Sequence, residues 1–276
     1  MKKIPEGIEV MKRIKFICAP AALMLALMLV LAACGKKTSA EDTAKDAVRA
    51  SIDAHNEANH LEIHMDVVQN VEMEGTSMKQ TATSDISVNK EPHEIYLDGS
   101  IESPALHFNM GFYRANDSYY MKTDELGEDW VNIDDPEVIS YLGDSLIMDY
   151  DKPNVYLQML LDDANKMTAQ TKDGEIRISV AEPTEKTKEA IASYFLDNLK
   201  DSELEGLELK SVDIQNMVII IDEETSLIQS ITMDQIIKLT YGDNNKLNAT
   251  QTLDMQYSGY DNTEVELPDD LKAVLG

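Results

Sequence analysis

The sequence predicts an α+β fold, a single large antiparallel sheet with helices against one face, preceded by an N-terminal signal peptide. Three observations support this prediction. Segments of alternating polar and apolar residues recur along most of the chain, a few helical apolar stripes interrupt them, and turn residues separate neighbouring segments. Alternation with period two is typical of a strand with one buried face, so a long series of such segments indicates an antiparallel sheet.

The N-terminal segment has the order of a secretory signal. Lys12, Arg13 and Lys15 precede residues 16–33, a run of eighteen residues without a charge. We therefore predict that residues 1–33 are a signal peptide, and that translation begins at Met11, where a second Met-Lys-Arg start occurs. An uncleaved transmembrane helix is the alternative, because eighteen uncharged residues just reach the length that spans a bilayer.

The end of the apolar run resembles the lipobox of bacterial lipoproteins. Residues 31–35 read Leu-Ala-Ala-Cys-Gly, with small residues directly before Cys34. The resemblance implies a diacylglyceryl thioether on Cys34, with residues 34–40 forming the lipidated cysteine and a short polar spacer. Two or more acyl chains anchor a protein stably, so the expected location is the cell membrane, lipid-anchored and facing outside the cytoplasm.

The composition excludes nucleic acid as a partner. The whole chain has 24 Lys and Arg against 51 Asp and Glu, and residues 34–276 alone have 19 against 49, a net charge of −30. Such a surface repels phosphate backbones. The two cysteines are Cys18, within the signal peptide, and Cys34, so no intramolecular disulfide is expected and stability must come from a hydrophobic core.

The first half of the domain predicts one helix and then strands. A helix is expected from Glu41, because Ala44, Ala47, Val48, Ser51 and Ile52 form one stripe. Strands are expected at residues 61–67, 78–88, 94–97, 106–112, 118–123 and 130–133.

The second half predicts helices in its middle and strands at its end. A short helix is expected from Pro136, and longer ones carry apolar stripes over residues 155–164 and 187–199. Strands are expected at residues 166–171, 175–180, 207–212, 217–221, 227–239 and 248–258. Lys172-Asp173-Gly174 between two alternating segments is typical of a β-hairpin.

No motif in the chain assembles a catalytic site, and we predict that the protein is not an enzyme. Ser87 and Lys90 have a Ser-x-x-Lys spacing, but this spacing aligns the two side chains only on a helix, and here it ends a strand. His60, Glu62 and His64 lie on one face of a predicted strand, so a weak metal site is conceivable. The same face continues to Asp66 and is more typical of a solvated strand; we expect no metal and no cofactor.

The C-terminal third resembles LolA/LppX-like lipoproteins. Residues 219–234 are similar to a strand, an acidic turn and a second strand of these proteins, and residues 256–268 resemble their closing strand and its exit. With Gly111-Phe112-Tyr113 and Trp130-Val131, the pattern matches uncharacterised Gram-positive lipoproteins of this fold. The resemblance implies that residues 41–276 form a strongly curved half-barrel whose concave side, covered by helices, encloses an apolar cavity.

The same resemblance implies a function in binding, because relatives of this kind bind or carry lipids or lipidated proteins. We expect a lipid or another apolar ligand, with Phe108, Met110 and Phe112 as the lining residues. These side chains would equally fill a closed core. The alternative is an interaction or regulatory module without a small-molecule ligand, in which a sheet edge or an acidic face binds an envelope protein.

Overall fold

A computed structural model describes residues 40–73, 75–104, 106–116, 118–124, 127, 129–134, 157–161, 166–189, 208–242, 245–262 and 264–276. All of these residues belong to one compact unit, residues 40–276. The predicted signal peptide, Cys34, residues 35–39 of the spacer, the helix expected at Pro136 and residues 190–199 of the helix expected over 187–199 lie outside the described residues. Ala40, predicted as the end of the spacer, is the first residue of the helix α2 (Ala40–Glu57). Within the described part of the chain, no helix has the length and the hydropathy required to span a bilayer.

The unit is built on one antiparallel sheet of eleven strands in the order β6-β5-β4-β3-β2-β1-β11-β10-β9-β8-β7. The sheet is not closed, since β6 and β7 stand at opposite ends of this order. This confirms the predicted fold class. The strands are β1 (His60–Met73), β2 (Thr76–Asn89), β3 (Glu94–Ser103), β4 (Leu106–Ala115), β5 (Ser118–Thr123), β6 (Val131–Asn132), β7 (Lys166–Lys172), β8 (Glu175–Glu182), β9 (Glu208–Asp222), β10 (Ile228–Tyr241) and β11 (Asn245–Ser258).

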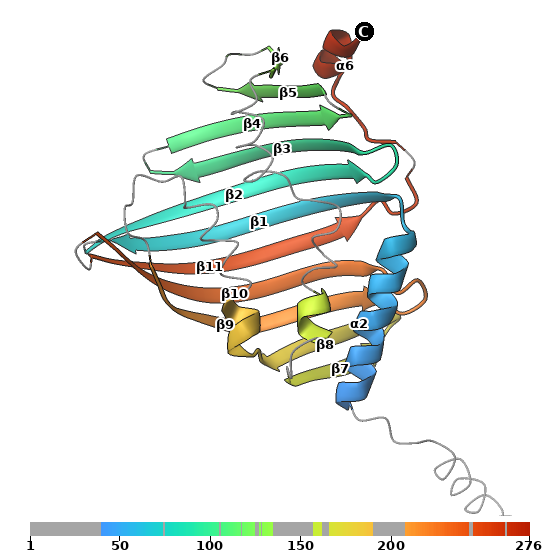
Figure 1. Ribbon diagram of the computed structural model, residues 1–276, viewed down its shortest axis with the longest axis vertical. Helices are drawn as coiled ribbons and strands as arrows, with labels where there is room; N and C mark the ends of the chain where they lie inside the picture. The colour runs from blue at the N-terminus through green and yellow to red at the C-terminus, as the bar shows by residue number, and fades with distance from the viewer. Residues whose placement is uncertain are drawn as a thin grey trace, which may run out of the picture. The chain divides into compact units, whose positions relative to one another are not determined.

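Two meanders make up this sheet. Strands β1 to β6 follow one another as neighbours, and so do β7 to β11 (Figure 1). The two halves meet where β1 pairs with β11, from Glu62 opposite Ser258 to Met73 opposite Leu247. This long pairing joins the N-terminal and C-terminal parts of the domain.

Most predicted strands are confirmed, and the β7–β8 hairpin has Asp173 and Gly174 at positive φ, as its turn requires. The prediction of separate strands at residues 207–212 and 217–221 is wrong, because β9 runs through both. Asn216 lies at φ 54° within β9, and the register against β10 shifts beside it. This bulge lets the apolar side chains on both sides of it face the same way.

The acidic turn between β9 and β10 has a local explanation. The Asp222 carboxylate accepts hydrogen bonds from the backbone N–H of Thr225 at 2.7 Å and of Glu224 at 3.1 Å, and from the Thr225 hydroxyl at 2.8 Å. These donors, the Thr225 N–H first, hold the pKa of Asp222 below its usual value. The Asp222 carboxylate therefore stabilises this turn.

The concave face of the sheet, defined by Ile63, Met65 and Val67 of β1, carries the main core. The helix α2 (Ala40–Glu57) buries Ala44, Ala47 and Val48 in the cluster that includes Ile63, and α2 packs on β7. The predicted stripe of α2 is thus confirmed. Helical residues 157–161 add Leu157 and Leu160 to the same cluster, and residues 185–189 are also helical.

The convex face carries a smaller apolar cluster beneath a C-terminal helix. This helix, α6 (Asp269–Leu275), was not predicted, and it buries Leu271 against Tyr113 and Trp130. Lys122 of β5 forms a 2.7 Å ion pair with Asp270. Gly111 of β4 lies directly beneath the indole, because a Cβ at this position would be 2.5 Å from Cη2 of Trp130.

Substituting Gly111 is therefore expected to destabilise the domain. Gly111→Ala should lower the free energy of unfolding by about 2 kcal/mol, since the rigid indole must move. Urea unfolding monitored by the fluorescence of Trp130, the single tryptophan, measures this change. Gly99→Ala in β3 is the matched control, because its Cβ would meet no atom closer than the rotatable Ser84 hydroxyl at 3.1 Å and the Thr83 backbone oxygen at 3.3 Å. A larger loss there would contradict the explanation.

Candidate functional site

The concave face is ordered into rows that cross several strands. In one apolar row, Phe108 lies opposite Ile101, which is opposite Ala82, and Ala82 is opposite Val67. Val67 in turn lies opposite Leu253 of β11. Four side chains of this row are half-buried, and the fifth, Ile101, is exposed at 38%. The row is therefore a strip of apolar surface that the core does not fully cover.

The three predicted lining residues lie in order along β4. Phe112, Met110 and Phe108 point to the concave face, as their alternation predicted. Phe112 is 1% exposed and belongs to the core, whereas Met110 and Phe108 are half-buried. Met110 and Phe108 are less buried than Phe112, so the apolar row begins where the packed core ends.

A second row on the concave face is polar, and sequence reasoning missed it. Gln80 of β2 lies opposite Gln69 of β1, Gln69 lies opposite Gln251 of β11, and Gln251 lies opposite Gln235 of β10. The Nε2 of Gln235 donates a hydrogen bond to Oε1 of Gln251 at 2.9 Å. A signal was present in the sequence, because positions 69, 235 and 251 continue the apolar phase of their strands.

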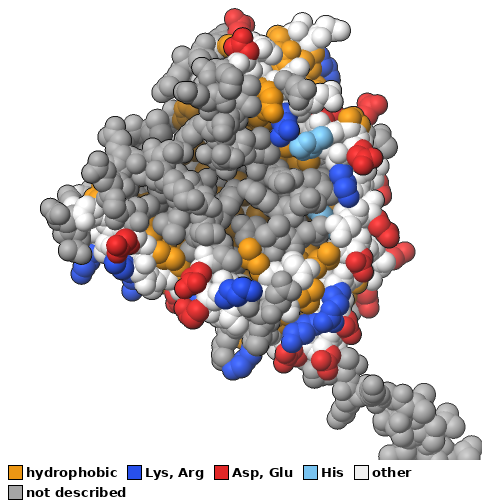
Figure 2. Space-filling view, in the orientation of Figure 1, with side chains coloured by type: hydrophobic (Ala, Val, Ile, Leu, Met, Phe, Trp, Pro, Cys, Tyr) orange, Lys and Arg blue, Asp and Glu red, His pale blue; other side chains and the backbone are white. Residues whose placement is uncertain are grey.

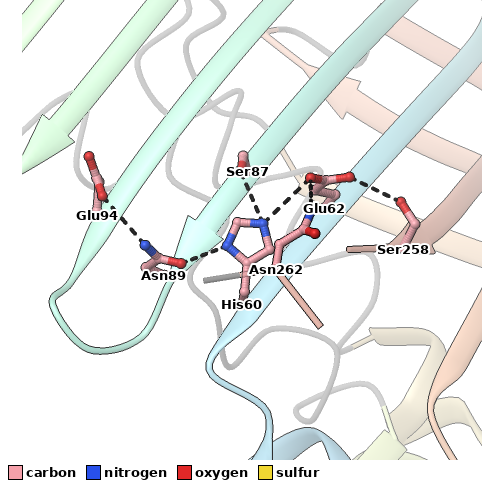
Figure 3. A network of polar contacts seen from close by, with 7 residues as sticks. All are labelled: His60, Glu62, Ser87, Asn89, Glu94, Ser258 and Asn262. Atoms are coloured by element: carbon pink, nitrogen blue, oxygen red, sulfur yellow. Dashed lines mark hydrogen bonds and ion pairs between the residues drawn. The ribbon is translucent and has the colours of Figure 1, made fainter. Parts of the chain in front are cut away.

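On the convex face, a network of polar side chains surrounds His60, which is fully buried (Figure 3). Its Nδ1 lies 2.6 Å from Oδ1 of Asn89, and an amide oxygen accepts, so Nδ1 donates. Its Nε2 lies 3.4 Å from the Ser87 hydroxyl and 3.6 Å from Glu62. Asn262 donates to the same Glu62 carboxylate at 2.7 Å.

This network continues across the strand ends. Asn89 donates to Glu94 of β3 at 3.5 Å, and the hydroxyl of Tyr113 in β4 donates to Glu94 at 2.6 Å. On the other side, Ser258 of β11 donates to Glu62 at 3.4 Å. The network therefore connects β11, β1, β2, β3 and β4, and its role is to hold these strand ends together.

Ser87, His60 and Asn89 stand in the order of a nucleophile, a base and an orienting group. A substrate cannot reach the imidazole, because His60 is fully buried, and Glu62 shares Nε2 with the serine. Lys90, the other member of the Ser-x-x-Lys spacing, donates to the backbone oxygen of Asn56 at 2.8 Å and does not meet Ser87. This arrangement supports structure rather than catalysis.

Of the possible metal ligands, His60 and Glu62 lie 3.6 Å apart, whereas His64 is engaged by other acids. His64 makes a 2.6 Å hydrogen bond with Asp85 and lies 3.4 Å from Asp66. Among the residues that the structure describes, no group of three or more acids, histidines or cysteines could hold a metal ion. The hydrogen bond to Asp85 and the charges of Asp85 and Asp66 raise the pKa of His64.

The acidic side chains do not gather in one patch of the visible face. Figure 2 shows them along its periphery, interspersed with Lys and Arg at the lower end. A groove of about 620 Å³ lies beside the Asn216 bulge, lined largely by convex-face residues such as Arg177 and Thr232. Asn216 donates to Asp234 at 3.0 Å, so polar groups of this groove already pair with one another.

Comparison with known proteins identifies a family but no activity. The model of a family of unknown function, DUF6612, matches residues 43–274. No curated protein matches the sequence.

Solved structures that resemble this one are distant. LprF from Mycobacterium bovis has 15% sequence identity and a TM-score of 0.43, covering 83% of this chain and 97% of its own. A domain provisionally assigned to outer membrane lipoprotein sorting, from Vibrio parahaemolyticus, has 9% identity and a TM-score of 0.28, covering 84% of this chain and 99% of its own.

The raised pKa of His64 predicts a pH-dependent stability. A raised folded pKa gives stabilisation that is fully present below the ordinary value of 6.5 and is lost as the pH rises through the folded value. Titration from about pH 5.5 to 8.5 should remove about 0.5 kcal/mol of unfolding free energy, a small amount because the pair is solvent-exposed.

The measurement compares urea unfolding of the wild type with His64→Gln, which should lack this part of the pH slope. Asp66, Asp85 and Asp254 are the acids around His64, and the difference between the two proteins separates its titration from theirs. His107→Gln is the control, since His107 is exposed and lies 3.7 Å from Glu102. Equal slopes in wild type and His64→Gln would refute the assignment.

Proposed function

We propose that this chain, which belongs to the DUF6612 family, is a membrane-anchored extracytoplasmic lipoprotein. It binds a lipid or another apolar ligand on the concave face of its sheet. The observation that carries this proposal is the half-buried apolar row from Phe108 through Ile101 and Val67 to Leu253. Soluble domains bury such contiguous surface unless it has a binding role.

The position of the row supports ligand binding rather than an unfinished core. Its side chains continue the face on which Phe112, Ile63 and Ile86 are fully packed. A ligand placed on the row would therefore extend an existing core and would not need a new pocket. The half-buried Met65 and Met110 flank the row, and flexible thioethers adapt to variable apolar ligands.

The membrane anchor is the second part of the proposal. Cys34 lies six residues before α2, and the intervening residues 35–39 are polar or small. A diacylglyceryl group on Cys34 would hold the domain near the membrane surface. This location would keep the domain close to a source of lipid.

The alternative is an envelope interaction module without a small-molecule ligand. It would use a sheet edge or the acidic surface, yet α2 packs on the edge strand β7, and β6 has only two residues. We favour ligand binding for this reason. We also propose that the protein is not an enzyme, since His60, the base beside Ser87, is inaccessible.

Lipidation is tested by substituting the two cysteines. Cys34→Ser should abolish incorporation of radiolabelled palmitate in growing cells, because a thiol is required to accept the diacylglyceryl group. Cys18→Ser is the matched control and should retain full labelling, since Cys18 lies within the expected signal peptide. Equal labelling of wild type and Cys34→Ser would contradict the anchor.

Ligand binding is tested on a secreted form running from Gly35 to Gly276, by native mass spectrometry with organic extraction. A lipid in near-stoichiometric amount is the expected result. A clean unliganded mass, with no uptake of added lipid, would favour the envelope interaction module.

Two substitutions locate the ligand. Ile101→Asn, on the concave face, should weaken uptake of a fluorescent fatty acid roughly fivefold, because apolar contact is lost. Val68→Asn is matched in exposure, as both residues are 38% exposed, but Val68 faces the convex side and its substitution should have no effect. Equal effects of the two variants would place binding elsewhere.

A further inference from the structure

The row of four glutamines lies inside apolar surface. On one side it is flanked by Ala82, Val67, Leu253 and Met233, and on the other by Met78, Val71, Ala249 and Ile237. Neighbouring strands are about 4.8 Å apart, so the row spans about 14 Å. No charged side chain belongs to these rows, and the glutamines are therefore the polar groups of this part of the concave face.

One atom of this row is unsatisfied. Gln235 is only 6% exposed, and its Nε2 is bonded to Gln251, but its Oε1 is buried without a hydrogen-bond partner. An unpaired buried polar atom costs stability, and native structures contain few of them. If the side-chain amides of Gln235 and Gln251 were both flipped by 180°, the atom without a partner would be the Nε2 of Gln235. One unsatisfied polar atom therefore remains in either orientation.

We propose that the glutamine row binds the uncharged hydroxyl group of an amphiphilic ligand, with the hydroxyl meeting Gln235 and the hydrocarbon lying along the neighbouring apolar row. This inference rests on the proposed function and specifies its ligand. The hydroxyl donates to Oε1 of Gln235, and because a hydroxyl also accepts, it suits both amide orientations.

Other head groups fit the row less well. An anionic or cationic head group would be desolvated without an ionic partner, which is unfavourable in apolar surroundings. The chain's net charge of −27 opposes an anion further. A pure hydrocarbon would leave Oε1 of Gln235 without a hydrogen-bond partner.

The burial of the glutamine row decreases from Gln235 to the half-buried Gln69 and Gln80. The polar end of the ligand would therefore enter from the β1–β2 side.

The test uses the full-length chain in its native membranes and two photoactivatable probes, a diacylglycerol with a free hydroxyl and the same molecule with that hydroxyl converted to a methyl ether. The wild type should be labelled about three- to tenfold more by the free hydroxyl, the effect of one hydrogen bond to a buried group. Gln235→Met, which keeps the shape, should lose this preference but retain labelling by the methyl ether.

Gln215→Met is the matched control, since Gln215 is exposed and bonds to Asp213 instead. Gln251→Met, which removes the partner of Gln235, provides a second variant if Gln235→Met does not fold. Equal labelling of the wild type by both probes, or an unchanged preference in the folded variants, would overturn the hydroxyl site and leave the proposed function standing. No labelling by either probe would overturn the proposed function itself.

Discussion

The pairing of β1 with β11 is the constraint on which the rest of the structure depends. Met65 lies opposite Met255 and Gln69 opposite Gln251, so the two meanders are joined between residues 190 and 182 positions apart. A slip of one residue would turn every side chain of one meander to the other face. The apolar row and the glutamine row both cross this junction, and neither would exist with a different register. Such distant pairing also forms late and slowly during folding.

The strands were predictable because their alternation is local. The helical stripe of α2 was predictable for the same reason. The bulge in β9 was not, since Asn216 resembles a turn residue and only the pairing with β10 shows that the strand continues. The short α6 was missed because its burial depends on Trp130, a contact that no local pattern encodes. The glutamine row required the register of four strands, although each glutamine stood at an apolar position of its own strand.

The two faces of the sheet contribute to stability in different ways, since the concave face carries the main apolar core. Much of the side-chain hydrogen bonding lies on the convex face, including the His60 network and the bonds of Asp234 to Asn216 and Thr252. These contacts hold the strand ends and the middle of the sheet without using concave side chains. Substitutions in the apolar row from Phe108 to Leu253 would leave these hydrogen bonds intact. Under the proposed function, the row could therefore vary with the ligand while the architecture stays the same.

The open order of the sheet, with β6 and β7 at its two ends, has a mechanical consequence. In a closed barrel, strand number and stagger fix the diameter, so the interior has one width. Here β6 and β7 are not hydrogen-bonded to each other, and a small change of twist at each strand pair adds up over ten junctions. The gap between the two ends can widen or narrow while every ladder stays intact. Under the proposed function, this freedom would let one domain accommodate apolar ligands of different widths.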